Sequence, residues 1–289
     1  MWFLVKMPKV WADTSQKCVC VEVVFSVCQT AKEIENAVRF YEGDVSWWNG
    51  PPAESSFWTD THAYGTLNAF FFDDLTNERA RIAENKYLNA AFFDDPERLL
   101  TICGLLVAAA RCDDRPAADL CTFRVERLTN FQEMKQAGHT IAFTSTSKAG
   151  FLDEYKDKRQ LVLLHFSIGS DTPCIDMQQV LSLYLKSDEQ EILLPPFLPL
   201  NFIPRPLTSA EQSIRDFDGF PPVAAYEAAV GAPVPALTPA VPFPAGGAQA
   251  GKRVFHALKN HHEPDTEDVS SYCAWKKAFR AQVRHRCKL

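Results

Sequence analysis

Hydrophobic residues recur at helical spacing in the first half of the chain and gather into short runs in the second half. Apolar positions three to four residues apart predict helices, whereas short apolar runs between turn residues predict strands. The predicted helices are 30–41, 76–93, 96–111 and 129–137. The predicted strands are 18–28, 120–126, 140–145, 160–168, 174–185, 190–194 and 198–203. Helices followed by strands, without regular alternation, favour an α+β fold.

The amino-acid composition changes after this strand-rich region. Residues 220–251 hold many Pro and Ala and lack any helical or strand periodicity, which predicts a linker. Residues 252–289 form a tail with one helix expected from about Ser270. We therefore expect one folded domain over 1–219, a linker over 220–251 and a tail over 252–289.

Composition places the chain among globular proteins. Of its 289 residues, 46% are hydrophobic, which is enough for a sizeable core. No apolar run approaches the roughly 20 residues that a membrane-spanning helix needs. The first residues lack the apolar stretch of a secretory signal, so we expect a soluble protein that is cytoplasmic or exported without a cleaved signal peptide.

Cysteine usage and charge limit the classes of partner that we expect this chain to bind. The nine cysteines include no Cys-x-x-Cys pair, which predicts reduced thiols and no metal site. The net charge is −6, and phosphate backbones require a basic face, so no nucleic acid is expected. Residues 252–289 alone carry nine Lys or Arg and four Asp or Glu. This basic tail is either a solvated helix or a contact for a partner or membrane surface.

Three segments of the strand-rich half carry possible chemistry: Phe123-Arg124, the Phe-Thr-Ser-Thr-Ser of 143–147, and the stretch 189–197. Each alone has a structural explanation, as a surface arginine, a turn or a solvated acidic pair. On an extended strand, however, Glu189 and Glu191 lie on one face about 6.5–7 Å apart. Two desolvated carboxylates at that separation repel, which favours a site that needs negative charge twice.

In order and spacing, the three segments resemble the arginine-specific branch of the mono-ADP-ribosyltransferases. That family has an aromatic-Arg strand, a Ser-Thr-Ser strand and a Glu-x-Glu strand, separated here by 21 and 46 residues. One departure is Val125, where the family often has Gly. The resemblance implies the ADP-ribosyltransferase fold, with two small, roughly perpendicular sheets around an NAD cleft and helices in the N-terminal half.

The resemblance also implies roles for individual residues, with NAD as substrate and no metal. Glu191 would bind the ribose 2′-OH and stabilise positive charge on the ribose, and Glu189 would orient the guanidinium of an arginine-containing protein acceptor. Arg124 would bind a phosphate of NAD, although Arg127 competes for that role. Ser145 would hold Glu191 through its hydroxyl.

The remaining expected site residues line the NAD pocket. Thr146 and Ser147 would support their strand and the pocket, and either Phe151 or Tyr155 would stack on nicotinamide. Two alternatives stay open: an NAD glycohydrolase, in which water replaces the arginine, and an inactive fold kept as a binding module. The presence of both Glu189 and Glu191 favours transfer to arginine.

Overall fold

The computed structural model describes residues 31–41, 63–72, 75, 93–111, 119–155, 158–181, 190–233 and 239–288. The chain divides into two compact units, one formed by Met1–Ala109 with Pro235–Leu289 and the other by Ala110–Val234. The predicted strand 18–28 and nearly all of the predicted helix 76–93 lie outside the described residues. In the part of the chain that is described, none of the helices is long and apolar enough to cross a membrane.

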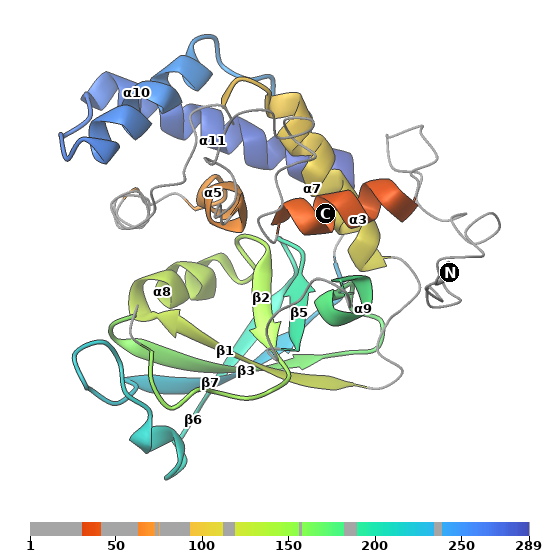
Figure 1. Cartoon of the computed structure of the whole chain (residues 1–289), viewed down its shortest axis with the longest axis vertical. Helices are drawn as coiled ribbons and strands as arrows, with labels where there is room; N and C mark the ends of the chain where they lie inside the picture. Colours follow the sequence, from red (N-terminus) through yellow and green to blue (C-terminus); the bar gives the residue numbers. More distant parts are fainter. Residues whose placement is uncertain are drawn as a thin grey trace, which may run out of the picture. The chain divides into compact units, whose positions relative to one another are not determined.

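In the described residues of the first unit, the secondary structure is helical. The helices are α3 (Ala31–Tyr41), α5 (Ala63–Ala69), α7 (Pro96–Arg111), α10 (Gly247–Lys259) and α11 (Thr266–Cys287) (Figure 1). Trp275 on α11 is buried. Its ring centroid lies 5.1–5.6 Å from those of Phe70, Phe93 and Phe279. A Cβ at Gly251 would lie 2.5 Å from the ring of Phe93, so this close approach of α10 requires glycine.

The second unit is a mixed sheet with short helices. In chain order its elements are β1 (Leu120–Arg127), α8 (Leu128–Ala137), β2 (Thr144–Ser147), β3 (Leu161–Ile168), β4 (Ile175–Asp176), α9 (Met177–Leu181), β5 (Glu191–Leu194), β6 (Leu200–Arg205), a 3-10 turn (Glu211–Ser213) and β7 (Ala224–Val230). The seven strands are ordered β4-β5-β2-β1-β3-β7-β6. The α+β class is therefore confirmed.

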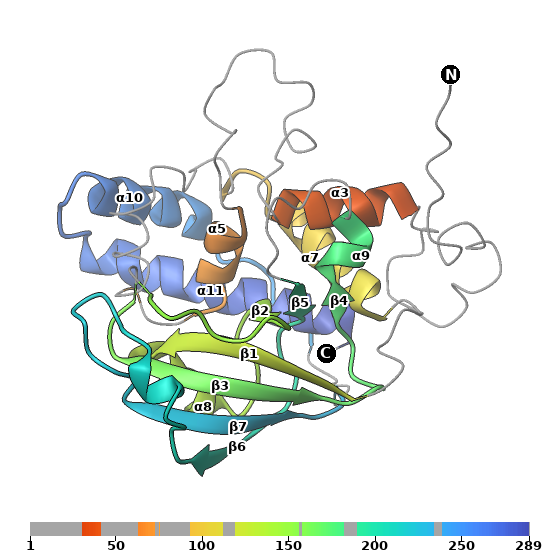
Figure 2. The ribbon, with the colours of Figure 1, turned by 60° about the horizontal axis from the view of Figure 1, so that its bottom comes forward.

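Neighbouring strands of the sheet pair over different lengths. β1 and β3 pair along their whole length, whereas β1 and β2 share one pair, Phe123 with Ser147. Figures 1 and 2 show β2 and β5 turned away from the layer formed by β1, β3, β7 and β6. The point where the sheet turns is therefore the β1–β2 junction, where the predicted motifs lie.

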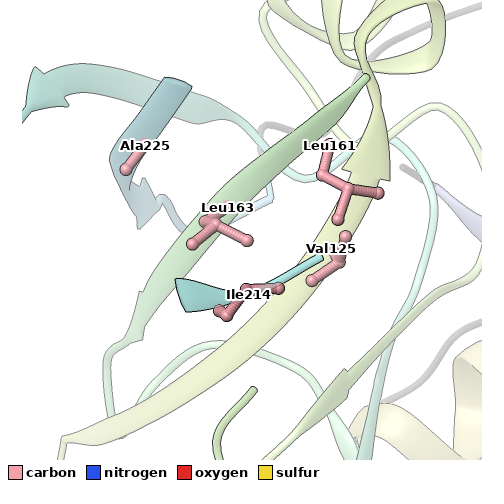
Figure 3. Packing of buried hydrophobic residues seen from close by; sticks show 5 residues of the cluster. All are labelled: Val125, Leu161, Leu163, Ile214 and Ala225. Carbon is pink, nitrogen blue, oxygen red and sulfur yellow. The ribbon is translucent and has the colours of Figure 1, made fainter. Parts of the chain in front are cut away.

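The two faces of the β1-β3-β7 layer are covered differently. On one face Val125, Leu163 and Ala225 are neighbours in register and pack with Leu161 and Ile214 (Figure 3). On the other face, α8 packs through Phe131, whose ring lies 4.5 Å from that of Tyr226 on β7 and 5.2 Å from that of Phe202 on β6. Adjacent residues of β1 therefore meet different surroundings, because side chains alternate between the faces.

The predicted linker is wrong in two places. Ala224–Val230 is strand β7, parallel to β3 and antiparallel to β6, and Gly247–Gly251 opens helix α10. Alanine has a low strand propensity, but β7 lies between two strands, and Ala225 and Ala228 are buried against them. Pairing with β3 and β6 therefore determines the structure of this segment, and the local sequence pattern does not predict it.

A second correction concerns the predicted strand 174–185. In its described part, residues 174–181, it is a strand at β4 and continues as helix α9 through Met-Gln-Gln-Val-Leu, mostly good helix formers. The Asp176 carboxylate accepts a hydrogen bond from the Gln178 amide at 3.2 Å, which begins this helix. The tail helix, expected from about Ser270, begins at Thr266.

Candidate active site

Strand pairing brings the three sequence motifs onto adjacent strands. β2 lies between β5 and β1, and Ser147 on β2 pairs with Phe123 on one side and Glu191 on the other. Directly paired residues project from the same side of a ladder. Residues that are 24 and 44 positions apart from Ser147 in the chain therefore line up across the sheet.

Arg124 projects from the opposite side of β1 to Phe123. Its Nε donates to Oε1 of Glu126 at 2.6 Å, and its Nη1 donates to the backbone carbonyl of Ser145 at 2.6 Å. Nη2 also forms an ion pair with Glu126. The arginine side chain is 24% exposed. The contact with the Ser145 carbonyl ties the first motif to the second.

Glu126 is a site residue that no sequence motif singled out. It is 3% exposed and accepts a hydrogen bond from Asn130 Nδ2 at 3.1 Å. Burial alone would raise the pKa of Glu126. The positive charges of Arg124 and Lys158, with the hydrogen bonds, outweigh burial and lower that pKa. The signal in the sequence was an oppositely charged residue two positions after Arg124, hence on the same strand face.

The hydroxyls of the second motif have distinct surroundings. Thr146 is buried and donates to the carbonyl of Ile192 at 3.1 Å, which binds β2 to β5. Ser147 Oγ accepts from the amide of Ala149 at 3.0 Å. Ser145 pairs with Leu193 and is therefore a diagonal neighbour of Glu191, whereas Ser147 is its direct partner.

The third motif is not a continuous strand. β5 begins at Glu191, and Gln190 has a φ of 48°, in the left-handed region that non-glycine residues rarely adopt. The extended geometry predicted for Glu189 and Glu191 therefore does not hold through Gln190, and Glu189 lies outside the described residues. Strain of this kind is often found beside functional residues.

The two aromatic candidates differ in their contacts. The Phe151 ring lies 5.2 Å from the ring of Phe123, the ladder neighbour of Ser147. The Tyr155 hydroxyl accepts a hydrogen bond from the Leu152 amide at 2.9 Å. Both rings pack against the cluster around Val125. Phe151 is thus the aromatic in contact with the motif residues.

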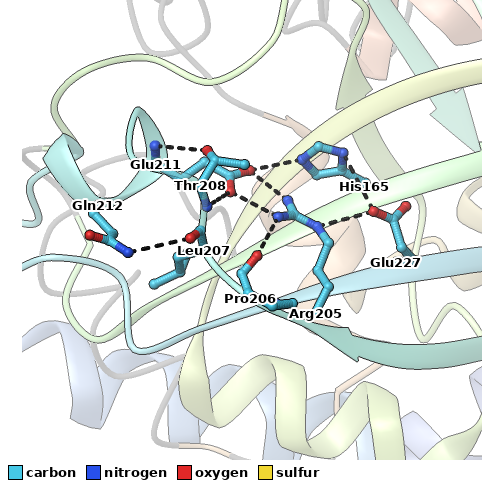
Figure 4. Close-up of polar contacts among 8 residues, drawn as sticks. All are labelled: His165, Arg205, Pro206, Leu207, Thr208, Glu211, Gln212 and Glu227. Atoms are coloured by element: carbon cyan, nitrogen blue, oxygen red, sulfur yellow. Dashed lines mark hydrogen bonds and ion pairs between the residues drawn. The ribbon is translucent and has the colours of Figure 1, made fainter.

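Figure 4 shows a charged cluster that includes His165, whose ring centroid lies 5.2 Å from that of Phe151. Glu211 is 5% exposed and binds both terminal nitrogens of Arg205, at 2.5 and 2.8 Å. Hydrogen bonds from Arg205, opposed by burial, hold the pKa of Glu211 at about 2, so its carboxylate is ionised. Nε2 of His165 lies 3.0 Å from this carboxylate and must donate the proton of that bond. The His165 ring lies 4.7 Å from that of Phe123.

In the described ranges, no group of three or more His, Cys, Asp or Glu is arranged to hold a metal ion. Arg127, the alternative phosphate-binding residue, ends β1 and projects from the same side as Phe123 and Val125, opposite to Arg124. Arg124 contacts the second motif through the Ser145 carbonyl.

No protein-family model matches the sequence, and a search of curated proteins finds no match. Several solved structures are similar to the chain. An ADP-ribosyltransferase from Clostridium botulinum is 16% identical with a TM-score of 0.37, over 68% of this chain and 86% of that one. The catalytic domain of VahC from Aeromonas hydrophila is 13% identical with a TM-score of 0.36, over 68% and 97%.

A third similar structure is an ADP-ribosyltransferase toxin from Paenibacillus larvae. It is 11% identical with a TM-score of 0.30, over 68% of this chain and 96% of that one. Because these identities and TM-scores are low, we argue function from the chain's own residues.

Proposed function

We propose that this protein is an NAD-dependent mono-ADP-ribosyltransferase that modifies arginine side chains of protein acceptors and releases nicotinamide. The observation that carries the proposal is the pairing of Phe123, Ser147 and Glu191 on three adjacent strands, with Arg124 bonded to the Ser145 carbonyl. The motifs were selected from the sequence by order and spacing alone. The three motif strands are adjacent at one junction of the sheet, with Arg124 on the side of β1 opposite to Phe123, and this adjacency supports a shared site.

Glu191 is the residue we assign to the reacting centre. NAD supplies the ADP-ribose, and the bond from its ribose to nicotinamide breaks as positive charge develops on the ribose. An ionised carboxylate stabilises such charge. Glu191 is partly buried at the start of β5, with Ser147 as its direct partner on β2. We assign to Ser147 and Ser145 the task of holding this carboxylate in place.

The diphosphate of the substrate is assigned to Arg124. A guanidinium has five N–H donors. The hydrogen bonds of Arg124 to Glu126 and to the Ser145 carbonyl use two of them, and Nη2 forms an ion pair with Glu126. The other donors are on the terminal nitrogens and suit a phosphate of NAD. Phe151, packed on Phe123, is our candidate for stacking on nicotinamide.

The acceptor is assigned through Glu189. In the transfer, the ribose carbon bonds to a guanidinium nitrogen, nicotinamide leaves with the electrons of the broken bond, and the guanidinium releases one proton. A carboxylate next to the guanidinium orients it and accepts that proton. Without such a group the ribose would react with water, which is the glycohydrolase reaction.

The test is incubation of the full chain with labelled NAD, with and without agmatine as an arginine-like acceptor. We expect ADP-ribosyl-agmatine and nicotinamide in equal amounts. Free ADP-ribose alone would identify a glycohydrolase, and uncleaved NAD with a folded protein would overturn the proposal. The matched control is Asp119→Asn, an exposed charge removal outside the site.

A further inference from the structure

The carboxylate of Glu126 contacts the side of the Arg124 guanidinium that carries Nε. The donated hydrogen bond is 2.6 Å long, and Nη2 of the same guanidinium forms an ion pair with the same oxygen, Oε1. Glu126 is 3% exposed. A buried charge-assisted contact of this kind fixes the plane of an arginine more firmly than a contact in water does.

Glu126 is itself held from a second direction. Its other oxygen, Oε2, accepts from Asn130 on α8, and Asn130 is also buried. Lys158 donates to the carbonyl of Val125 at 3.0 Å and places a further positive charge near the carboxylate. Because both oxygens are engaged by residues of different elements, the carboxylate cannot rotate without losing hydrogen bonds.

The consequence for Arg124 is directional. Nε donates to Glu126, one donor of Nη1 is on the Ser145 carbonyl, and Nη2 forms an ion pair with Glu126, so the donors that are left belong to Nη1 and Nη2. These terminal nitrogens form the edge of the guanidinium that binds two oxygens of one phosphate. The direction of that edge is set by the length of the side chain at position 126.

We propose that Glu126 is a positioning residue that acts through Arg124 and aims two N–H donors at the diphosphate of NAD. The inference rests on the proposed function, because it needs NAD as the ligand. It states that phosphate affinity depends on the reach of residue 126 and on its acceptor oxygen, whereas its charge matters less.

Two variants separate reach from charge. Glu126→Gln keeps the length and one acceptor oxygen for Nε of Arg124 but removes the charge, and the Asn130 amide can turn over to accept from the new amide. Glu126→Asp keeps the charge but shortens the side chain by one methylene. Asp119→Asn serves as the control for loss of an exposed negative charge.

The experiment measures binding of ADP and adenosine to each full-length protein by calorimetry, with a thermal melt to monitor folding. These ligands differ only in the diphosphate. We expect ADP affinity within about threefold of wild type in Glu126→Gln and at least about tenfold weaker in Glu126→Asp, since a charge-assisted bond is lost. Adenosine binding should change in neither variant.

Other results would overturn the inference. Wild-type affinity in Glu126→Asp with tighter ADP binding in Glu126→Gln would mean that Glu126 acts only by its charge. Equal loss of ADP binding, adenosine binding and melting temperature in both variants would leave Glu126 a purely structural role. If wild type binds ADP no better than adenosine, the phosphate role of Arg124 and the proposed function fail first.

Discussion

Ser147 and Glu191 are direct partners in the antiparallel pairing of β2 with β5. The Cβ atoms of such partners lie about 4.5–5.5 Å apart, so a serine hydroxyl can reach the neighbouring carboxylate. The family resemblance implies that Ser145 holds Glu191. In the observed register Ser145 pairs with Leu193, one side-chain step further along the strand. Ser147 is therefore the first serine to test.

Replacement of Glu191 by Gln should abolish both transfer and hydrolysis of NAD. The change is isosteric and removes the charge that faces the ribose, a loss that typically costs about 10²–10³ in rate. The measurement is nicotinamide release, together with a melting curve. Near-wild-type release from a normally folded variant would remove Glu191 from the mechanism.

The two serines should differ in importance. In Ser147→Ala we expect kcat to fall by about threefold to tenfold, the value of one hydrogen bond. In Ser145→Ala, whose side chain is only diagonal to Glu191, we expect a smaller fall. Steady-state nicotinamide release in both variants provides the comparison. A larger loss in Ser145→Ala would favour the assignment expected from the sequence.

Glu189→Gln should separate transfer from hydrolysis. Glu191 remains, so nicotinamide can still leave and water can still attack. What is lost is the carboxylate that orients a guanidinium and accepts its proton, usually worth about 10²–10⁴ in rate. The ratio of ADP-ribosyl-agmatine to free ADP-ribose measures this. An unchanged ratio would remove the physical basis for arginine specificity.

The burial pattern of strand β7 predicts that Asp substitutions at two neighbouring alanines differ strongly in their cost in stability. Ala228 is fully buried beside Phe166, whereas Ala229 is exposed. Ala228→Asp should cost at least about 3 kcal/mol by burying a charge, and Ala229→Asp should cost little. Urea denaturation of both variants tests this. Equal stability would mean that residues 224–230 are the linker that the sequence predicted.

The elements that sequence predicted well are those with strong local patterns. Helix 96–111, strand 120–126 and strand 160–168 correspond to α7, β1 and β3 within a few residues. In the helix, apolar residues recur at helical spacing, and in the two strands they form short runs, so local and tertiary preferences agree. β7 has no such pattern because alanine is compatible with helix, strand and linker, and its pairing partners come from distant parts of the chain.

The residues of the candidate site stay a prediction from motif spacing. Strand pairing brings Ser147 beside Glu191, and Arg124, on the opposite side of β1 from Phe123, donates to the Ser145 carbonyl. Strand register and the left-handed Gln190 follow from long-range contacts, which no local pattern encodes. Glu126 was missed because an opposite charge two positions after Arg124 is usually part of a solvated surface pair, and only its burial distinguishes it.

The ionised carboxylate of Glu211 should make the stability of the protein depend on pH in the acid range. Its pKa is lowered from an ordinary 4.5 to about 2, mainly by hydrogen bonds from Arg205, with burial opposing the shift. A lowered pKa contributes stability that is fully present above pH 4.5 and is lost as pH falls towards 2. Glu211→Gln should lose about 2 kcal/mol near neutral pH, because Arg205 loses a buried ionic partner. The difference in unfolding free energy between wild type and Glu211→Gln should therefore shrink between pH 4.5 and 2.

Urea denaturation at pH values across this window measures the difference, with Asp119→Asn as the control for an exposed carboxylate. A gap that stays constant through the window would mean that Glu211 is not ionised and paired in the folded protein.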